Sequence, residues 1–457
     1  MKIINPSTEA IMAEVQEDNV ESIAKKFALA TQVQPAWAAL EIKERIGIIT
    51  RFYGLLETEK DELAGILTAE VGKPLKQSYN ELKGARGRIT FFLENAGQWL
   101  AEEWITTEGP TREKVTYEAL GVIANISAWN YPYLVGVNVF IPALISGNAV
   151  LYKPSEFATL TGLQIEKLML QAGVPKGVFQ CITGGGGAGN ALIELPLNGY
   201  FFTGSYATGK KIAQATAGKL VIVQMELGGK DPLYVMDDVE DIKAVAAAAL
   251  EGVMYNAGQS CCAVERIYVH ELVYEAFEKA IIEEAEKLKT GDPLKADTDM
   301  GPLCRPQQLK VLSGQVDDAI QKGAKILYRS PTVPPKGYYF PVVLLGRANH
   351  TMAIMKEESF GPVVGIQKVS TDEEAIELMM DTEYGLTAAV YGNNMERAEN
   401  IMRQMRTGTV YFNCCDRVSA SLPWGGRGHS GLGSTLGTQG IRAFVQPKAW
   451  HIRAFGG

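Results

Sequence analysis

Two cysteines stand side by side at positions 261 and 262, within the stretch NAGQSCCAVERIYVH (256–270). A cysteine thiolate is a strong nucleophile, so either residue could attack an electrophilic carbon. A buried cysteine is more often a small apolar filler. No histidine is positioned by the sequence to activate the pair, so backbone dipoles, a cofactor or a carboxylate would have to do so. The residues alone indicate a candidate nucleophile without choosing between Cys261 and Cys262.

Two glycine-containing turns could hold a phosphate or a nucleotide. The stretch GVFQCITGGGGAGNALIE places a G-x-G-x-x-G pattern at Gly184, Gly186 and Gly189, after an expected strand and before an expected helix. Four consecutive glycines match almost any such pattern, and a flexible turn explains them equally well. In FFTGSYATGKKIAQATAG, Gly204 permits close backbone approach, and Ser205 stands where a helix N-terminus would attract an anion. A simple helix cap is the alternative there.

The composition narrows the class of protein. The chain has 457 residues, enough for two or three domains, and a formal net charge of -8, which argues against nucleic acid or anionic membranes as partners. No apolar run approaches about 18 residues and no leader pattern opens the chain, so we expect a cytoplasmic protein. Six cysteines and four histidines show neither disulfide-scaffold nor metal-ligand spacing, so no metal is expected.

The elements that must position these residues follow an alternating pattern. The first ~100 residues have apolar positions at helical spacing. Short apolar runs then alternate with helical stretches, at 121–127, 147–154, 177–183, 199–205 and 219–229. This pattern is typical of βαβ units with parallel strands, and a second such series follows. We expect two α/β lobes that meet near residues 226–230, and two further strands, at 112–120 and 444–455, whose free edges need a partner.

Seven motifs together resemble the aldehyde dehydrogenase superfamily: AWNYP (128–132), KPSE (153–156), FTGS (202–205), MELGGKDP (225–232), NAGQSCCA (256–263), EESFGPV (357–363) and PWGGRGHSGLG (423–433). The resemblance runs from INPSTEA (4–10) to FVQPKAW (444–450). It implies an NAD(P)-dependent enzyme that oxidises a small-molecule aldehyde to a free acid.

The resemblance also implies an α/β fold with three parts. A Rossmann-type NAD-binding domain would span residues 1–100 and 120–227, and an α/β catalytic domain would span 228–442. A small β flap for oligomerisation would combine 101–119 with 443–457, which suits the two expected strands outside the lobes. A homodimer or homotetramer is therefore expected.

The resemblance assigns three catalytic roles. Cys261 would attack the aldehyde, and hydride loss from the resulting thiohemiacetal would leave a thioester. Asn130 and the backbone N–H of Cys261 would stabilise the oxyanion. Glu226 would be the general base for hydrolysis, with a pKa raised by its apolar surroundings. Members of the family that pass the acyl group to coenzyme A lack this glutamate; such an enzyme, or a catalytically silent relative with a binding role, remains the alternative.

The cofactor contacts implied by the resemblance come from four of the motifs. Lys153 and Glu156 would hold the adenosine ribose, and the carboxylate would repel a 2′-phosphate, so NAD is favoured and NADP remains possible. The pyrophosphate and the nicotinamide end would be held by Gly204, Ser205, Trp129, Glu358 and Phe360. The glycine run 184–187 would lie toward the adenine, and Lys73 of EVGKP is given a structural role.

By resemblance the mouth of the substrate pocket is formed by Val135, Asn138, Tyr255, Cys262, Asp416, Val418 and Trp424. This mixture of aromatic and polar groups favours no single aldehyde. Arg417 is a candidate partner for a substrate carboxylate, as an enzyme for an acid semialdehyde would need.

Overall fold

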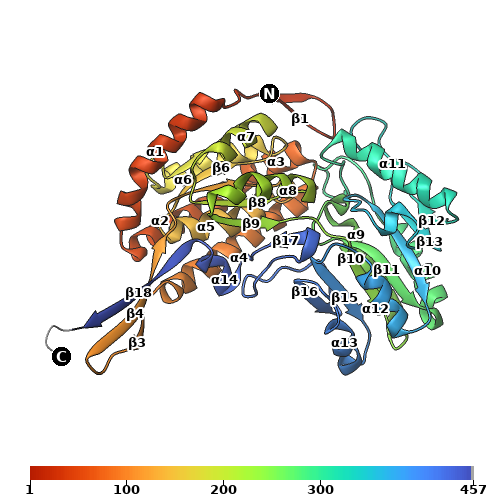
Figure 1. The fold of residues 1–457 in the computed structure, drawn as a ribbon. Coiled ribbons are helices and arrows are strands. Elements are labelled where there is room, and N and C mark those ends of the chain that lie inside the picture. Colours follow the sequence, from red (N-terminus) through yellow and green to blue (C-terminus); the bar gives the residue numbers. More distant parts are fainter. Residues whose placement is uncertain (454–457) are drawn as a thin grey trace.

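The first lobe is built on a six-stranded sheet of order β17-β9-β8-β5-β6-β7. The structure is a computed structural model that describes residues 1–453 (Figure 1). Five of the strands are parallel: β5 (Val122–Ile126), β6 (Ala149–Lys153), β7 (Phe179–Cys181), β8 (Gly199–Thr203) and β9 (Ile222–Glu226). The chain order reverses between β5 and β8. In such doubly wound sheets, ligands bind at the carboxyl ends of the strands beside this reversal.

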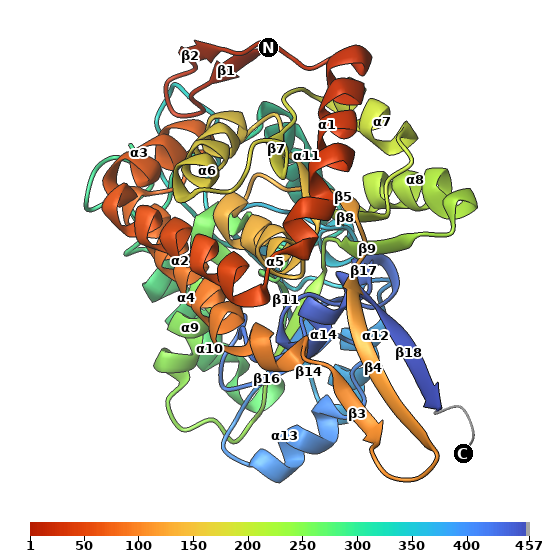
Figure 2. The ribbon, with the colours of Figure 1, turned by 90° about the vertical axis from the view of Figure 1, so that its left-hand side faces the viewer.

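Helices cover both faces of this sheet. On one face lie α1 (Val20–Ala39), α7 (Gly186–Glu194) and α8 (Tyr206–Thr216). On the other lie α5 (Pro132–Ile145) and α6 (Thr159–Ala172), backed by α2 (Ile42–Thr58), α3 (Lys60–Val71) and α4 (Leu75–Trp99) (Figure 2). Coverage on both faces explains why every residue of β5 and β6 is buried and why the two strands are mostly apolar rather than alternating. A hairpin of β1 (Lys2–Ile4) and β2 (Ile11–Glu14) precedes α1.

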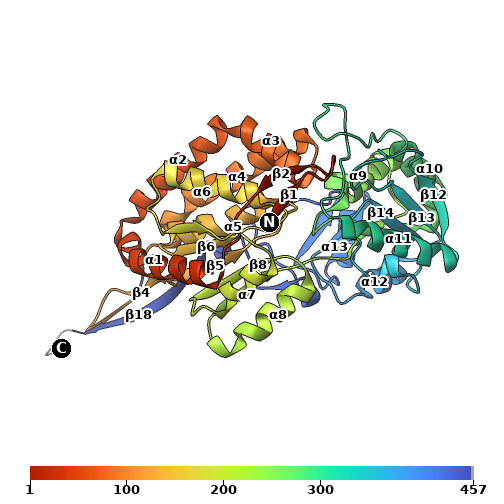
Figure 3. The same cartoon turned by 90° about the horizontal axis from the view of Figure 1, so that it is seen from above.

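The second lobe contains a seven-stranded sheet of order β12-β13-β14-β11-β10-β15-β16. Its strands are β10 (Asp231–Val235), β11 (Val264–His270), β12 (Lys325–Arg329), β13 (Val343–Gly346), β14 (Val363–Val369), β15 (Thr387–Tyr391) and β16 (Thr409–Phe412). All are parallel except β12. The accompanying helices are α9 (Ile242–Met254), α10 (Glu271–Ala285), α11 (Pro306–Gln321), α12 (Asp372–Met380) and α13 (Met395–Met402). The two lobes stand side by side (Figure 3).

A three-stranded antiparallel arm projects from the first lobe (Figure 1). The strand expected at 112–120 is β4 (Thr111–Ala119), and the strand expected at 444–455 is β18 (Val445–Arg453); all nine residues of β18 pair with β4. The sequence missed the third strand, β3 (Glu103–Thr106), which pairs with the other edge of β4. Residues 454–457 of the expected flap segment lie outside the described residues.

The last part of the chain returns to the first lobe. Strand β17 (Gly431–Leu432) pairs antiparallel with β9, with Gly431 opposite Glu226. The short helix α14 (Gly437–Arg442) then leads into β18. The 3₁₀ turns are η1 (Ala217–Lys219), η2 (Tyr255–Gly258), η3 (Ala353–Met355) and η4 (Gly428–Ser430). Among the helices of residues 1–453, none combines the length and the apolar character needed to cross a membrane.

Candidate active site

The predicted site residues converge between the lobes because of strand direction. Asn130 follows β5 and Glu226 ends β9, so both lie at the carboxyl edge of the first sheet. Cys261 and Cys262 precede β11, at the amino edge of the second sheet. A hydrogen bond joins the two edges, because Nδ2 of Asn130 donates to the Gln259 carbonyl oxygen at 3.1 Å.

A sharp turn presents the two cysteines. Helix α9 ends at Met254, and η2 follows with Asn256 and Ala257 at φ of 54° and 55°, a region that non-glycine residues rarely adopt. At Gly258, whose φ is +71°, a Cβ would lie 2.3 Å from the Gly361 carbonyl oxygen. Only glycine fits there, so the turn locks against the β14 side of the lobe.

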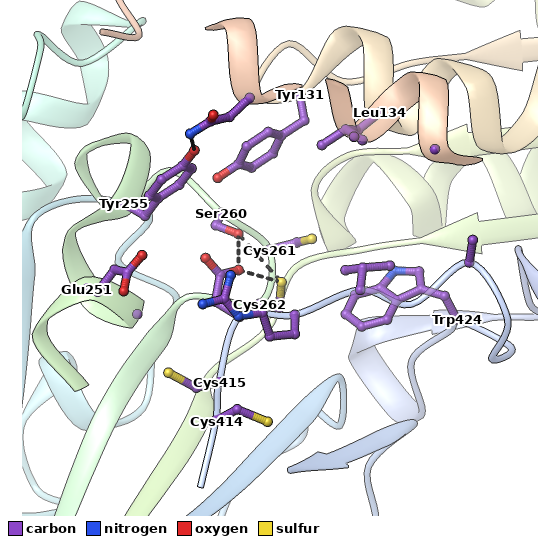
Figure 4. Close-up of a pocket in the computed structure, with 18 of the residues that line it drawn as sticks. Tyr131, Leu134, Glu251, Tyr255, Ser260, Cys261, Cys262, Cys414, Cys415 and Trp424 are labelled. Atoms are coloured by element: carbon purple, nitrogen blue, oxygen red, sulfur yellow. Dashed lines mark hydrogen bonds between the residues drawn. The ribbon is translucent and has the colours of Figure 1, made fainter. Parts of the chain in front are cut away.

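The structure distinguishes the adjacent thiols (Figure 4). Cys262 is buried, and its Sγ donates to Asp416 Oδ1 at 3.0 Å, an oxygen that also accepts from Ser260 Oγ at 3.1 Å. A hydrogen bond with Cys261, together with burial and the Asp416 carboxylate, raises the pKa of Cys262 well above its usual value. Cys261 is half-buried and lines the cavity described below. Cys262 is therefore held as a neutral thiol, while Cys261 is accessible.

Asn130 is pinned from both sides. Its backbone oxygen accepts from Lys73 Nζ at 2.8 Å and from Asn256 Nδ2 at 3.2 Å. Lys73 forms a fully buried ion pair with Glu81, and Glu81 Oε1 accepts the Tyr133 N–H at 2.8 Å. This ion pair fixes the turn at 130–133, which is a positional reason for a lysine in EVGKP. The Asn130 amide then holds one orientation, beside the backbone of the nucleophile loop.

Glu226 is the last residue of β9 and lies opposite Gly431 of the C-terminal strand β17. Its Oε1 accepts from Thr435 Oγ1 at 3.5 Å, while Oε2 is buried and has no partner among the described residues. Burial raises the pKa of Glu226 to about 8. The carboxylate is thus a base that becomes available only near or above neutral pH.

The expected adenosine contacts lie at the end of β6. Lys153 is buried and its Nζ donates to the Pro154 carbonyl at 3.1 Å, whereas Glu156 is exposed. Burial lowers the pKa of Lys153, and the charge of Glu156 opposes that shift. A Cβ at Gly189, two residues after the glycine run, would lie 3.7 Å from Lys153 Cε, so the helix that follows the run passes beside this lysine. Ser205 caps α8 and accepts from the Thr208 N–H at 3.4 Å; Gly204 adjoins it.

At the end of the site opposite the adenosine contacts, the ring of Trp129 from the first lobe packs against the ring of Phe360 from the second. Their centroids are 5.6 Å apart. The Phe360 backbone has φ of 50°, and its N–H donates to Glu265 Oε1 at 3.0 Å. Glu358 Oε1 accepts the Gly229 N–H at 3.2 Å. Burial and the neighbouring Glu265 raise the pKa of Glu358 to about 8.

The sequence analysis missed the ion pair that supports this corner. Lys230 Nζ and Glu265 Oε2 are 2.7 Å apart and both side chains are buried. Glu265 also accepts the Ser359 N–H at 2.9 Å, so the pair fixes the EESFGP turn. The charged pair Glu265-Arg266 inside the mostly apolar run CAVERIYVH was the available signal.

A cavity of about 830 Å³ opens beside Cys261. Its lining includes all seven residues expected at the pocket mouth, and Arg417 as well. It also includes residues that the sequence did not single out for it: Asn80, Lys83, Arg88, Tyr131, Leu134, Glu251, Cys414 and Cys415. In residues 1–453, no cluster of three or more His, Cys, Asp or Glu side chains is arranged to hold a metal ion.

Comparisons with known proteins find relatives that match along nearly the whole chain. Peroxisomal aminoaldehyde dehydrogenase 1 of Pisum sativum is 34% identical over 97% of this chain and 91% of its own length. The crystal structure of betaine aldehyde dehydrogenase from Staphylococcus aureus in complex with NAD+ is similar with a TM-score of 0.94 and 30% identity, covering 99% of this chain and 91% of that one. An E. coli NADP-dependent enzyme gives a TM-score of 0.96 and 30% identity, with 99% and 94% coverage.

The resemblance noted in the seven motifs thus extends to whole-chain similarity in sequence and fold. A family model described as the aldehyde dehydrogenase family matches residues 1–450. The chain belongs to the aldehyde dehydrogenase family.

Proposed function

We propose that the protein oxidises an aldehyde to the free carboxylic acid, with NAD as the hydride acceptor. The observation that carries the proposal is the meeting of three groups: an accessible thiol at Cys261, a fixed amide at Asn130, and a buried carboxylate with one unpaired oxygen at Glu226. These are the groups that covalent aldehyde oxidation needs.

The chemistry follows from their placement. The Cys261 sulfur adds to the aldehyde carbon, and the carbonyl electron pair moves to oxygen. The Asn130 amide and the Cys261 N–H donate to that oxyanion; loss of such a donor costs about 2.7–4 kcal/mol of transition-state stabilisation. NAD held by Trp129, Glu358 and Phe360 would supply the acceptor for the hydride that leaves this carbon. Cys261 is left as a thioester.

Glu226 completes the cycle by removing a proton from the water that attacks the thioester. The carboxylate accepts a hydrogen bond from Thr435, which follows the strand β17 that pairs with β9. The product is a free acid, and the thiol of Cys261 is regenerated.

The pH profile of kcat should report Glu226. Its pKa is raised to about 8 by burial, so the basic form grows as the pH rises through that value. If hydrolysis limits turnover, kcat should increase with pH and level off above about 8. Steady-state rates across this range measure it, and a kcat that falls over the same range would contradict the assignment.

The cofactor contacts favour NAD. Exposed Glu156 lies beside buried Lys153, and Ser205 begins the helix α8, whose N-terminus suits a pyrophosphate. Trp129, Phe360 and Glu358 would hold the nicotinamide end. The relatives include an NAD+ complex and an NADP-dependent enzyme, so both cofactors have to be measured.

Glu156→Gln should weaken the discrimination against NADP. The exposed carboxylate repels a 2′-phosphate, and its loss should raise the kcat/KM ratio of NADP to NAD by roughly 5- to 10-fold at low salt. Glu21→Gln, which removes an exposed charge from α1, is the matched control. An unaltered ratio in the Glu156 variant would show that Glu156 does not select the cofactor.

One assay tests the whole proposal. The purified protein is given short, long, aromatic and carboxylated aldehydes with NAD or NADP, with and without coenzyme A, and the reduced cofactor and acyl products are quantified. We expect NADH and free acid in equal amounts. An acyl-coenzyme A product would point to the alternative acyl transfer, and no turnover of any aldehyde would point to a silent relative.

The arm supplies a route to assembly. Strands β18 and β3 are the two outer strands of this sheet, and exposed Trp450 and Ile105 lie on them. We expect these edges to pair with a second copy, giving a homodimer or homotetramer. Light scattering that returns the mass of one chain would contradict this.

A further inference from the structure

Arg88 is a cation inside the substrate cavity that the chemistry above leaves unused. It lies on α4 and is partly buried. Its Nη1 donates to the Leu134 carbonyl oxygen and to Asn138 Oδ1, both at 3.0 Å. Both acceptors belong to α5, so one corner of the guanidinium is fixed to the cavity wall.

The rest of the guanidinium is uncommitted. Neither Nε nor Nη2 of Arg88 has an acceptor among residues 1–453, and the side chain forms no ion pair there. Arg266 offers a comparison, because it is fully buried and all three of its nitrogens donate to protein oxygens. The two unused nitrogens of Arg88 are not among the buried polar atoms that lack a partner, so they are open to the cavity, where a ligand can accept from both.

Arg88 lies close to the reacting groups. Burial lowers the pKa of Arg88 to about 10, and the neighbouring groups whose charges oppose that shift are Cys262 and Cys261, then Glu81 and Glu226. A group bound by Arg88 would therefore belong to the same molecule whose aldehyde meets Cys261.

The two carboxylates of the cavity, Glu251 and Asp416, form no ion pair with Arg88 among residues 1–453. Figure 4 shows Leu134 and Trp424 on one side of the cavity and Glu251 on the other, with Cys261 and Cys262 between them. Asp416 is engaged by Ser260 and Cys262. Arg88 lies on the wall that carries Leu134, whose carbonyl oxygen it contacts.

We infer that Arg88 binds a carboxylate on the substrate, so that the substrate class is an aldehyde that also carries an acid group. The inference rests on the proposed aldehyde oxidation. With Nη1 held by α5, Nε and Nη2 form the side edge of the guanidinium, which matches the two oxygens of a carboxylate. The exposed Arg417, which the sequence suggested for this role, stands at the rim.

The test compares aldehydes of equal length: succinic semialdehyde, neutral butanal and cationic 4-aminobutanal. We expect the wild-type protein to prefer the semialdehyde. In Arg88→Gln, the ratio of kcat/KM for semialdehyde to that for butanal should fall about 10- to 100-fold, as expected for loss of charged hydrogen bonds. Most of the loss should appear in KM, because the contact is equally present before and during the reaction. Arg88→Lys should recover only part of it, since an ammonium lacks the planar edge.

Arg86→Gln is the matched control. It removes the same charge from the same helix, but Arg86 pairs with Glu57 and stacks on Tyr53, outside the cavity. Its substrate ratio should equal that of the wild type. Thermal melting of each variant reports folding.

Three results would overturn the inference. They are an equal loss for semialdehyde and butanal in Arg88→Gln, a wild-type preference for aminobutanal, and a selective loss in Arg417→Ala instead of Arg88→Gln. Absence of NADH with every aldehyde would instead refute the proposed function, so the two failures are distinguishable.

Discussion

Cys261→Ala is expected to lose aldehyde oxidation by a factor on the order of 10⁵–10⁶, the scale seen when a covalent nucleophile is removed. Without the sulfur no thiohemiacetal forms, and hydride has no tetrahedral carbon to leave. The remaining thiol does not replace it, because Cys262 is buried and donates to Asp416 at 3.0 Å, and the substitution leaves both features in place. The neighbouring position is therefore not a reserve nucleophile.

Cys262→Ala is the matched control, since it removes an identical group one residue away. Ser260 remains as a donor to Asp416, so this variant should keep the covalent chemistry. Intact-protein mass spectrometry after mixing with aldehyde and NAD measures the acyl adduct directly. An adduct in Cys261→Ala, or its disappearance only in Cys262→Ala, would exchange the assigned roles.

Glu226→Gln is expected to stop the cycle after hydride transfer. The amide is nearly isosteric and keeps an oxygen for Thr435, but it cannot take a proton from water. Loss of a general base costs about 10²–10⁴-fold. Thioester hydrolysis should therefore become rate-limiting, and the rise of kcat with pH should vanish.

The Glu226→Gln variant should form NADH in an initial burst. Stopped-flow measurement should show about one equivalent of NADH per active site formed rapidly, followed by slow turnover, with the acyl group on the peptide that contains Cys261. Hydroxylamine, which cleaves thioesters, should release it. A variant that loses the burst along with turnover would place Glu226 before hydride transfer instead.

The sequence predicted several strands of both sheets, although it missed β3 and β17. Runs such as GVIANIS and GNAVLYKP became β5 and β6 because parallel strands covered on both faces are mostly apolar. The motif residues came from the family resemblance, and their roles stay predictions. The pocket-mouth residues were also found, because the resemblance carries them by position.

The contacts that the sequence could not give are those between distant segments. The difference between Cys261 and Cys262 depends on Asp416, more than 150 residues later in the chain. The unused edge of Arg88 depends on how α4 packs against α5. Strand β17 has only two residues, too few for any periodic pattern, and its partner β9 lies about 200 residues earlier. No local signal records such pairings.

That last pairing has a consequence for synthesis on the ribosome. Strand β9 and Glu226 emerge about 200 residues before the segment that covers them. At ~5–20 residues per second, the edge of the first sheet waits for roughly 10–40 s, and strand β4 of the arm waits longer still for β18. The nascent first lobe therefore presents open strand edges throughout translation of the second. Slow or interrupted synthesis should expose this chain to mispairing and to chaperones at β9 and β4, well before any active site exists.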